Sequence, residues 1–168
     1  MIAYESALKG DLRLRVEAVS SRTFRVRIAD VEASEPGMNR YGFILPQPEP
    51  VANVLDADAF LTVETEAASL RVSKEDGAIW LQNGAGHTIL QSSESPVCKR
   101  SGFEAGFALA AGSRVYGLGD VTRERLEKTG FAVEMWTENV EKYIPIPFLS
   151  STAGWGLYLN TTWRHRFD

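Results

Sequence analysis

The chain has 168 residues, of which 44% are hydrophobic and 24% are charged. This length and mixture are typical of one globular domain and argue against a disordered, collagen-like or membrane-spanning chain. The formal net charge of −4 comes from 22 acidic and 18 basic residues scattered along the sequence. Because no basic stripe is available to neutralise phosphates, nucleic acid is not expected as a partner.

The single cysteine and the N-terminal residues bear on the cellular compartment. Cys98 is the only cysteine, which excludes an internal disulfide framework and a cysteine-based zinc site, and we expect a buried, unreactive thiol. Residues 1–10 contain Glu5 and Lys9 and no apolar run, so neither a signal peptide nor a membrane anchor is predicted there. We therefore expect a cytoplasmic protein that binds no membrane, and the sequence predicts no metal and no other cofactor.

The first part of the chain predicts antiparallel strands. Residues 12–29 alternate apolar and polar side chains and are interrupted at residues 20–22, which predicts a hairpin of two half-buried strands. The proline-rich residues 46–50 cannot donate ladder hydrogen bonds at their prolines, so they are expected to form a connection.

A meander of strands is predicted next, over residues 60–65, 70–73 and 78–82. Asp76-Gly77 and Asn83-Gly84 are expected to supply the positive φ angles of its tight hairpin turns.

The second half of the chain continues this pattern. Strands are predicted over residues 88–91, 102–109, 144–150 and 155–160, at intervals typical of sandwiches and barrels. Only residues 120–128 are compatible with a helix. The predicted fold is therefore all-β, an antiparallel β-sandwich of two packed sheets.

Two short patterns suggest chemistry that their surroundings do not support. Gly117-Leu118-Gly119 resembles part of a nucleotide loop, but Thr122 stands where the dinucleotide fingerprint has its third glycine. His87 and His165 are the only histidines, and they lack the nearby carboxylate spacing of a metal site or a catalytic triad. Structural roles are favoured for both patterns.

The segment from residue 131 to residue 148 mixes aromatic and polar side chains in a way that suits sugars. Aromatic faces stack on the C–H surfaces of sugars, while amides and carboxylates bind hydroxyl groups. On these residues alone, an aromatic edge of the core is the favoured explanation, because aromatic residues at strand spacing usually serve packing. Glu134, Glu138 and Glu141 also invite comparison with the paired carboxylates of glycoside hydrolysis, but solvated acids are the favoured explanation because the sequence does not fix their separation.

Several motifs together resemble a known family. The order and spacing of these motifs are similar to those of the N-terminal domain of glycoside hydrolase family 31, the α-glucosidase and α-xylosidase family. The motifs are Val115-Tyr116-Gly117-Leu118-Gly119-Asp120, Gly130, Met135-Trp136, Ile146-Pro147-Phe148, Gly154-Trp155-Gly156 and Asn160-Thr161. Residues 16–28 resemble the opening hairpin of that domain and residues 62–90 resemble its central meander, so the resemblance covers nearly the whole chain.

The resemblance implies a galactose-mutarotase-like β-sandwich that forms a single N-terminal domain over residues 1–168. In that family the sandwich continues beyond the position of Asp168, so the last strands are expected to be missing. The nucleophile and the acid/base aspartate lie in a following (β/α)8 barrel, which this chain does not contain. The chain itself is therefore expected to be inactive, with no catalytic residue, and its parent is expected to be a glycoside hydrolase.

The resemblance also implies a sugar-binding loop. The family's usual Trp-Asn-x-Asp run carries a carboxylate that reaches over the barrel mouth towards the sugar, and here the run is Trp136-Thr137-Glu138-Asn139. We expect Trp136, Glu138 and Asn139 to bind substrate. Asn139 is the leading candidate because its amide can both donate to and accept from hydroxyl groups. The alternative is that Asn139 caps a turn.

The expected partners are an α-glycoside and the C-terminal catalytic barrel of the same polypeptide. The family acts on α-glucosides, α-xylosides, α-galactosides or sulfoquinovosides, and nothing in these residues selects one. An uncovered docking surface for the barrel would favour homo-oligomers of the isolated chain.

Two rival functions stay open. One is a free-standing carbohydrate-binding module with Trp136, Trp155 and Trp163 as its platform. The other is a mutarotase-like epimerase, which needs a paired acid and base.

Overall fold

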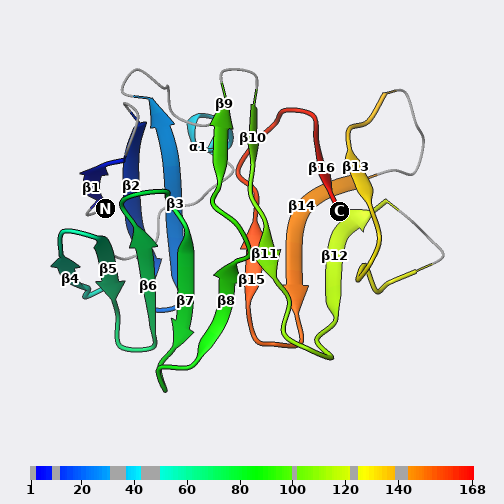
Figure 1. The fold of residues 1–168 in the computed structure, drawn as a ribbon. Helices are drawn as coiled ribbons and strands as arrows, with labels where there is room; N and C mark the ends of the chain where they lie inside the picture. Colours follow the sequence, from blue (N-terminus) through cyan, green and yellow to red (C-terminus); the bar gives the residue numbers. More distant parts are fainter. Residues whose placement is uncertain are drawn as a thin grey trace. The chain divides into compact units, whose positions relative to one another are not determined.

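The computed structural model describes residues 3–8, 12–30, 37–42, 50–99, 102–121, 125–138 and 144–168 (Figure 1). In these ranges the strands are antiparallel, and the helix α1 (Gly37–Arg40) has only four residues. The predicted all-β antiparallel class is therefore confirmed. Contacts between Cα atoms divide the chain into two compact units, of which unit 1 comprises Met1–Ser34 and Pro46–Leu109, and unit 2 comprises Glu35–Leu45 and Ala110–Asp168. The single domain over residues 1–168 stays a prediction.

Unit 1 contains two main sheets and a short ribbon. The three-stranded sheet has the order β1-β2-β3, from β1 (Ala3–Ala7), β2 (Leu12–Ser20) and β3 (Thr23–Asp30). The six-stranded sheet has the order β11-β8-β7-β6-β5-β4, from β4 (Asn53–Asp56), β5 (Phe60–Glu64), β6 (Ala68–Ser73), β7 (Ile79–Asn83), β8 (Thr88–Ser92) and β11 (Phe107–Ala108). The ribbon pairs β9 (Val97–Lys99) with β10 (Gly102–Glu104).

The two main sheets of unit 1 share one apolar core, with β2 and β3 lying behind β6 and β7 in the view of Figure 1. Every second side chain of these strands points inward, as the period of two requires. The buried core residues on β2, β5 and β6 are Leu14, Val16, Ala18, Leu61, Val63, Leu70 and Val72. Burying one such aliphatic side chain other than alanine contributes about 1.5–3 kcal/mol, so packing of the two faces holds this sandwich together.

Unit 2 contains a three-stranded sheet and a two-stranded ribbon. The sheet has the order β12-β14-β15, from β12 (Val115–Asp120), β14 (Ile144–Ser151) and β15 (Gly156–Tyr158). The ribbon pairs β13 (Val133–Met135) with β16 (His165–Phe167). Leu118, Val133 and Met135 form the buried core of this unit, with Val121, Leu149 and Phe167 packed against them.

The helix that the sequence allows over residues 120–128 is wrong for the described part of that range. Asp120 ends β12, and Glu127 forms an isolated antiparallel bridge with Tyr116. The N–H of Lys128 donates to the carbonyl of Val115 at 2.7 Å, so this stretch finds its backbone partner on β12 and not in a helical turn. Residues 122–124 lie outside the described ranges.

The structure also corrects one predicted turn and one predicted strand. In the hairpin after β7 the positive φ falls on Gly86, at 79°, and not on Gly84. The Oδ1 atom of Asn83 accepts from the N–H groups of Ala85 and His87, which makes the turn wider than the sequence suggests. The strand expected over residues 102–109 is interrupted between β10 and β11. The other turn glycine, Gly77, has the expected positive φ of 78°.

Three remaining expectations concern the connection, the thiol and the membrane. Residues 46–49 of the proline-rich connection lie outside the described ranges. Cys98 is half-buried on β9, and this burial raises the pKa of its thiol, which favours the unreactive form. Among the described residues, no helix has the length and apolar character needed to cross a membrane.

Candidate functional site

Trp136 directly follows β13, a strand whose inward-facing side chains pack into the core of unit 2. Val133 and Met135 are buried and pack with Leu118, whereas Glu134 between them points outward. Side chains alternate along a strand, so Trp136 leaves the ribbon on the same side as Glu134. Its side chain is 44% exposed, which leaves a large part of the indole available to a ligand.

A hydrogen bond joins two of the three residues that the sequence assigns to sugar binding. The indole Nε1–H of Trp136 donates to Oε1 of Glu138 at 2.8 Å. This bond holds the carboxylate beside the indole, so an apolar face and an acceptor oxygen are presented together. Asn139 lies outside the described residues, and its role stays a prediction.

Arg164 joins this cluster from the other strand of the ribbon. The residue lies immediately before β16, and its Nε–H donates to Oε1 of Glu134 at 2.5 Å. This hydrogen bond, the charge of Glu134 and, more weakly, the charge of Glu138 raise the pKa of Arg164 above its usual value. The sequence analysis missed Arg164, because only the pairing of β13 with β16 brings it next to Glu134.

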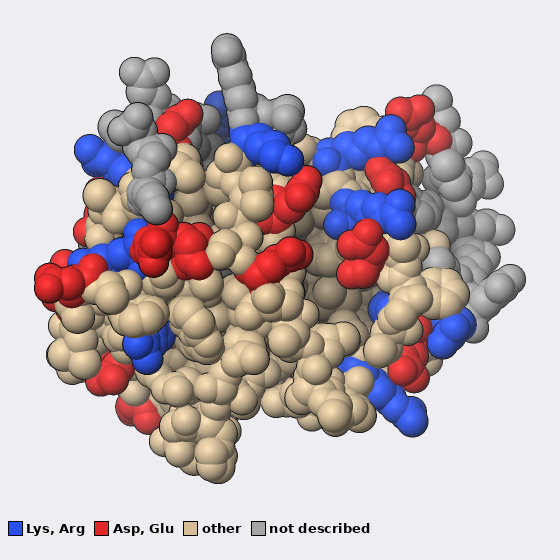
Figure 2. All heavy atoms as spheres, in the orientation of Figure 1, with Lys and Arg blue, Asp and Glu red and all other residues tan. Residues whose placement is uncertain are grey.

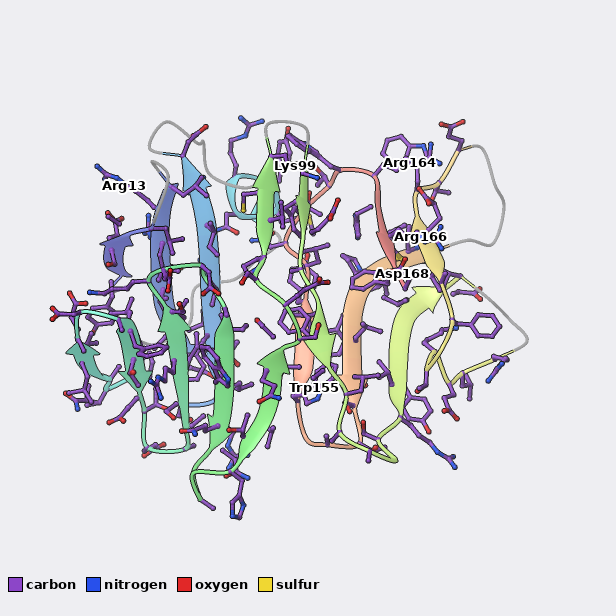
Figure 3. All side chains as sticks on the ribbon, in the orientation of Figure 1. Arg13, Lys99, Trp155, Arg164, Arg166 and Asp168 are labelled. Atoms are coloured by element: carbon purple, nitrogen blue, oxygen red, sulfur yellow. The ribbon has the colours of Figure 1, made fainter. Side chains whose placement is uncertain are left out.

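The charges of the ribbon balance one another. Figure 3 shows Arg164 just before β16, Arg166 on it and Asp168 just after it, and the guanidinium of Arg166 lies 3.4 Å from the carboxylate of Asp168. In Figure 2 the blue and red side chains are interspersed over this part of the surface. The ribbon therefore presents no field of a single sign that would select a strongly charged ligand.

The Gly-Leu-Gly stretch of β12 has a structural explanation. Gly117, Leu118 and Gly119 have positive φ angles of 125°, 65° and 73°, and they form an irregularity in the pairing of β12 with β14. A Cβ atom on Gly119 would overlap the carbonyl oxygen of Ile144. The glycines allow the two backbones to approach, and the bulge turns Leu118 into the core. No nucleotide needs to be invoked for this motif.

A groove of about 590 Å³ lies beside this bulge, lined partly by Tyr116, Asp120, Arg125 and Lys128. Its cationic side chains are already engaged. The ammonium of Lys128 is buried and donates to the carbonyl of Arg125 at 2.7 Å, and the guanidinium of Arg125 lies over the ring of Phe131 at 4.6 Å. We therefore assign this groove no ligand.

The histidines and Trp155 do not form the sites considered from the sequence. His87 is exposed in its hairpin turn, and the Nδ1 atom of His165 forms a hydrogen bond of 2.6 Å with the carbonyl oxygen of Trp163. Within the described ranges, no three His, Cys, Asp or Glu side chains are grouped so that they could hold a metal ion. Trp155 is only 6% exposed and lies away from Arg164 in Figure 3, so it cannot serve as part of a sugar platform with Trp163.

Residues 13–168 match the family described as the glycosyl hydrolase 31 N-terminal galactose mutarotase-like domain. The chain therefore belongs to this family, and the resemblance and the galactose-mutarotase-like β-sandwich expected from the sequence are confirmed. No curated protein shows significant similarity to the chain.

Solved structures share the fold at low sequence identity. A family-31 α-xylosidase from Xanthomonas citri matches 98% of this chain with 19% of its own, at 19% identity and a TM-score of 0.73. A family-31 dextranase from Flavobacterium johnsoniae, complexed with glucose, matches 100% of this chain with 23% of its own, at 14% identity and a TM-score of 0.76. A family-31 α-xylosidase from a soil metagenome, complexed with xylose, matches 99% of this chain with 28% of its own, at 18% identity and a TM-score of 0.75. The chain thus spans less than a third of each of these proteins.

Proposed function

We propose that this chain is the non-catalytic N-terminal domain of a retaining family-31 α-glycosidase. It packs on the catalytic barrel of the same polypeptide and lends the segment that begins at Trp136 to the sugar-binding pocket. The observation that carries this proposal is the hydrogen-bonded pair of Trp136 and Glu138, presented at the end of the β13–β16 ribbon.

The chemistry of this pair suits an α-glycoside. The indole face offers apolar area for the C–H surface of a sugar ring, and the ionised Glu138 offers acceptor oxygens to hydroxyl groups. The solved relatives named as α-xylosidases and as a dextranase support a sugar of this class.

An exposed apolar face of unit 2 supports docking to the barrel. Ile144, Ile146 and Phe148 alternate along β14 with less exposed residues, and Tyr158 on β15 pairs with Phe148. These four side chains share one face of the sheet and are between 37% and 60% exposed. Contiguous apolar surface of this kind is typical of an interface with another domain or subunit.

Kinetics of the longer polypeptide test the pocket assignment. Trp136→Ala and Glu138→Gln are each expected to lower kcat/KM for an α-glycoside about tenfold, which corresponds to about 1.4 kcal/mol of transition-state stabilisation. Asn139→Ala tests the third predicted residue in the same assay. Trp163→Ala is the matched control, because Trp163 is an exposed tryptophan in the bend before β16 and is not one of the three residues assigned to sugar binding. Unchanged kcat/KM in all three loop variants would overturn the assignment.

The carbohydrate-binding rival predicts a different pattern. A free-standing module would bind an oligosaccharide as the 168-residue chain, and Trp163→Ala would weaken that binding. The accessory-domain proposal instead predicts that measurable sugar binding requires the barrel. Calorimetric titration of the isolated chain with an α-glucan oligosaccharide therefore separates the two functions.

A further inference from the structure

Arg164 connects the ribbon to the candidate sugar-binding segment. We propose that Arg164 is a positioning residue that holds Trp136 and Glu138 in place for substrate, acting through Glu134 and Glu138 without contacting the substrate itself. This inference rests on the proposed function of the segment and adds a residue from a distant part of the sequence to it.

The geometry places Arg164 at the point where the ribbon ends and the segment begins. Met135 and His165 form the last paired positions of β13 and β16, and Trp136 and Arg164 are the next residues on each strand. The hydrogen bond from Nε of Arg164 to Glu134 crosses this last rung diagonally. It therefore ties the two backbones together next to Trp136, where no further backbone pairing is present in the ladder.

The second link is electrostatic. The charge of Glu138 acts on Arg164 more weakly than the hydrogen-bonded Glu134, so the guanidinium attracts one carboxylate on each side of Trp136. Glu138 is in turn bonded to the indole of Trp136. Glu134, Arg164, Glu138 and Trp136 thus form a connected chain from the ribbon to the exposed indole.

Spectroscopy of the 168-residue chain tests this connection directly. The indole N–H resonance of Trp136 reports its bond to Glu138, and Glu138→Ala defines the position of that resonance when the bond is absent. Arg164→Ala is expected to move the resonance most of the way to that position. Arg164→Lys is expected to move it less, because lysine keeps the charge but lacks the planar guanidinium fork.

Arg166→Ala is the matched control for charge. Arg166 lies on β16, two residues after Arg164, and is paired with Glu134 in the ladder, and its guanidinium forms an ion pair with Asp168. The Trp136 resonance should stay at its original position in this variant. The indole resonance of the buried Trp155 should be unchanged in every variant, which distinguishes a local effect from loss of the fold.

Kinetics of the longer polypeptide then test positioning for substrate. Arg164→Ala is expected to raise KM about fivefold, the upper end for an exposed ion pair, with little change in kcat, and Arg164→Lys should restore part of the loss. An unmoved Trp136 resonance in Arg164→Ala overturns the inference even if Trp136→Ala impairs the enzyme. A moved resonance with unchanged KM also overturns it. Unchanged kinetics in Trp136→Ala and Glu138→Gln would instead remove the proposed function of the segment.

Discussion

Gly119 and Gly130 have the same backbone φ of 73° but different surroundings. A Cβ atom on Gly119 would overlap the carbonyl oxygen of Ile144, whereas a Cβ atom on Gly130 would have no neighbour within 4 Å. Comparing alanine substitutions at these two positions therefore separates two free-energy costs. One is the cost of a side chain on a left-handed backbone, and the other is the cost of a Cβ atom that overlaps the neighbouring strand.

Gly130→Ala is expected to lower the free energy of unfolding by about 1 kcal/mol, the usual cost of placing a side chain in the left-handed region. Gly119→Ala is expected to cost at least about 3 kcal/mol, because β12 must also move away from β14. Urea denaturation of both variants measures the difference. Equal losses would show that the close approach of β12 and β14 contributes nothing.

Some residues of the candidate site can be identified as candidates from the sequence, and others cannot. Trp136 and Glu138 can be found from the sequence, because the Met-Trp motif and the mixture of aromatic and polar side chains mark their segment. Arg164 cannot, because its role depends on the pairing of two three-residue strands. Such short strands carry too little periodicity to predict which strand pairs with which.

Glu17 on β2 is an acidic residue buried on the polar face of the β1–β3 sheet. Its two carboxylate oxygens bind the guanidinium of Arg15 at 2.8 Å and that of Arg25 at 2.7 Å, while its side chain is almost fully covered. Removing one partner of a buried ion pair leaves uncompensated charge in a poorly solvated place. The carboxylate therefore holds β2 and β3 together on the face opposite the core.

Glu17→Ala is expected to lower the free energy of unfolding by about 3 kcal/mol, since it leaves Arg15 and Arg25 without their shared anion. Glu5→Ala provides the control, because Glu5 on β1 is exposed and only 3.8 and 4.0 Å from Arg13 and Arg15. A loss of at most about 0.5 kcal/mol is expected there. The interpretation fails if the two variants have the same midpoint in urea.

At the level of strands, the sequence predicts well where the period of two is unbroken. β2, β3 and the meander of β5 to β7 follow it, because one face of each strand packs into the core. β12 was not predicted, since its two glycines and its bulge interrupt the alternation. The helix expected after β12 was wrong for a related reason. The N–H of Lys128 donates to the carbonyl of Val115 on β12, and a local sequence pattern does not reveal a hydrogen bond between residues so far apart in the sequence.

At the scale of the whole chain, the proposal that another domain covers part of the surface is supported by the length of the relatives and by the exposed apolar side chains. The solved relatives are several times longer than the span that this chain matches in them. Ile144, Ile146, Phe148 and Tyr158 form the apolar face of β14 and β15 that we assign to the barrel. Without the barrel, this face is free to bind a second copy of the chain.

The 168-residue chain is therefore expected to self-associate reversibly, and the double variant Ile144→Thr/Ile146→Thr is expected to remain monomeric in sedimentation velocity. Because both isoleucines are exposed, each substitution should change the free energy of unfolding by no more than about 0.5 kcal/mol. Val51→Thr is the control, since Val51 is exposed in unit 1 and lies outside this face. Association through apolar surface should strengthen in sulfate, whereas association through ion pairs should weaken as salt is added. Undiminished self-association of the double variant would show that another surface is responsible, and it would remove the main support for barrel docking on β14.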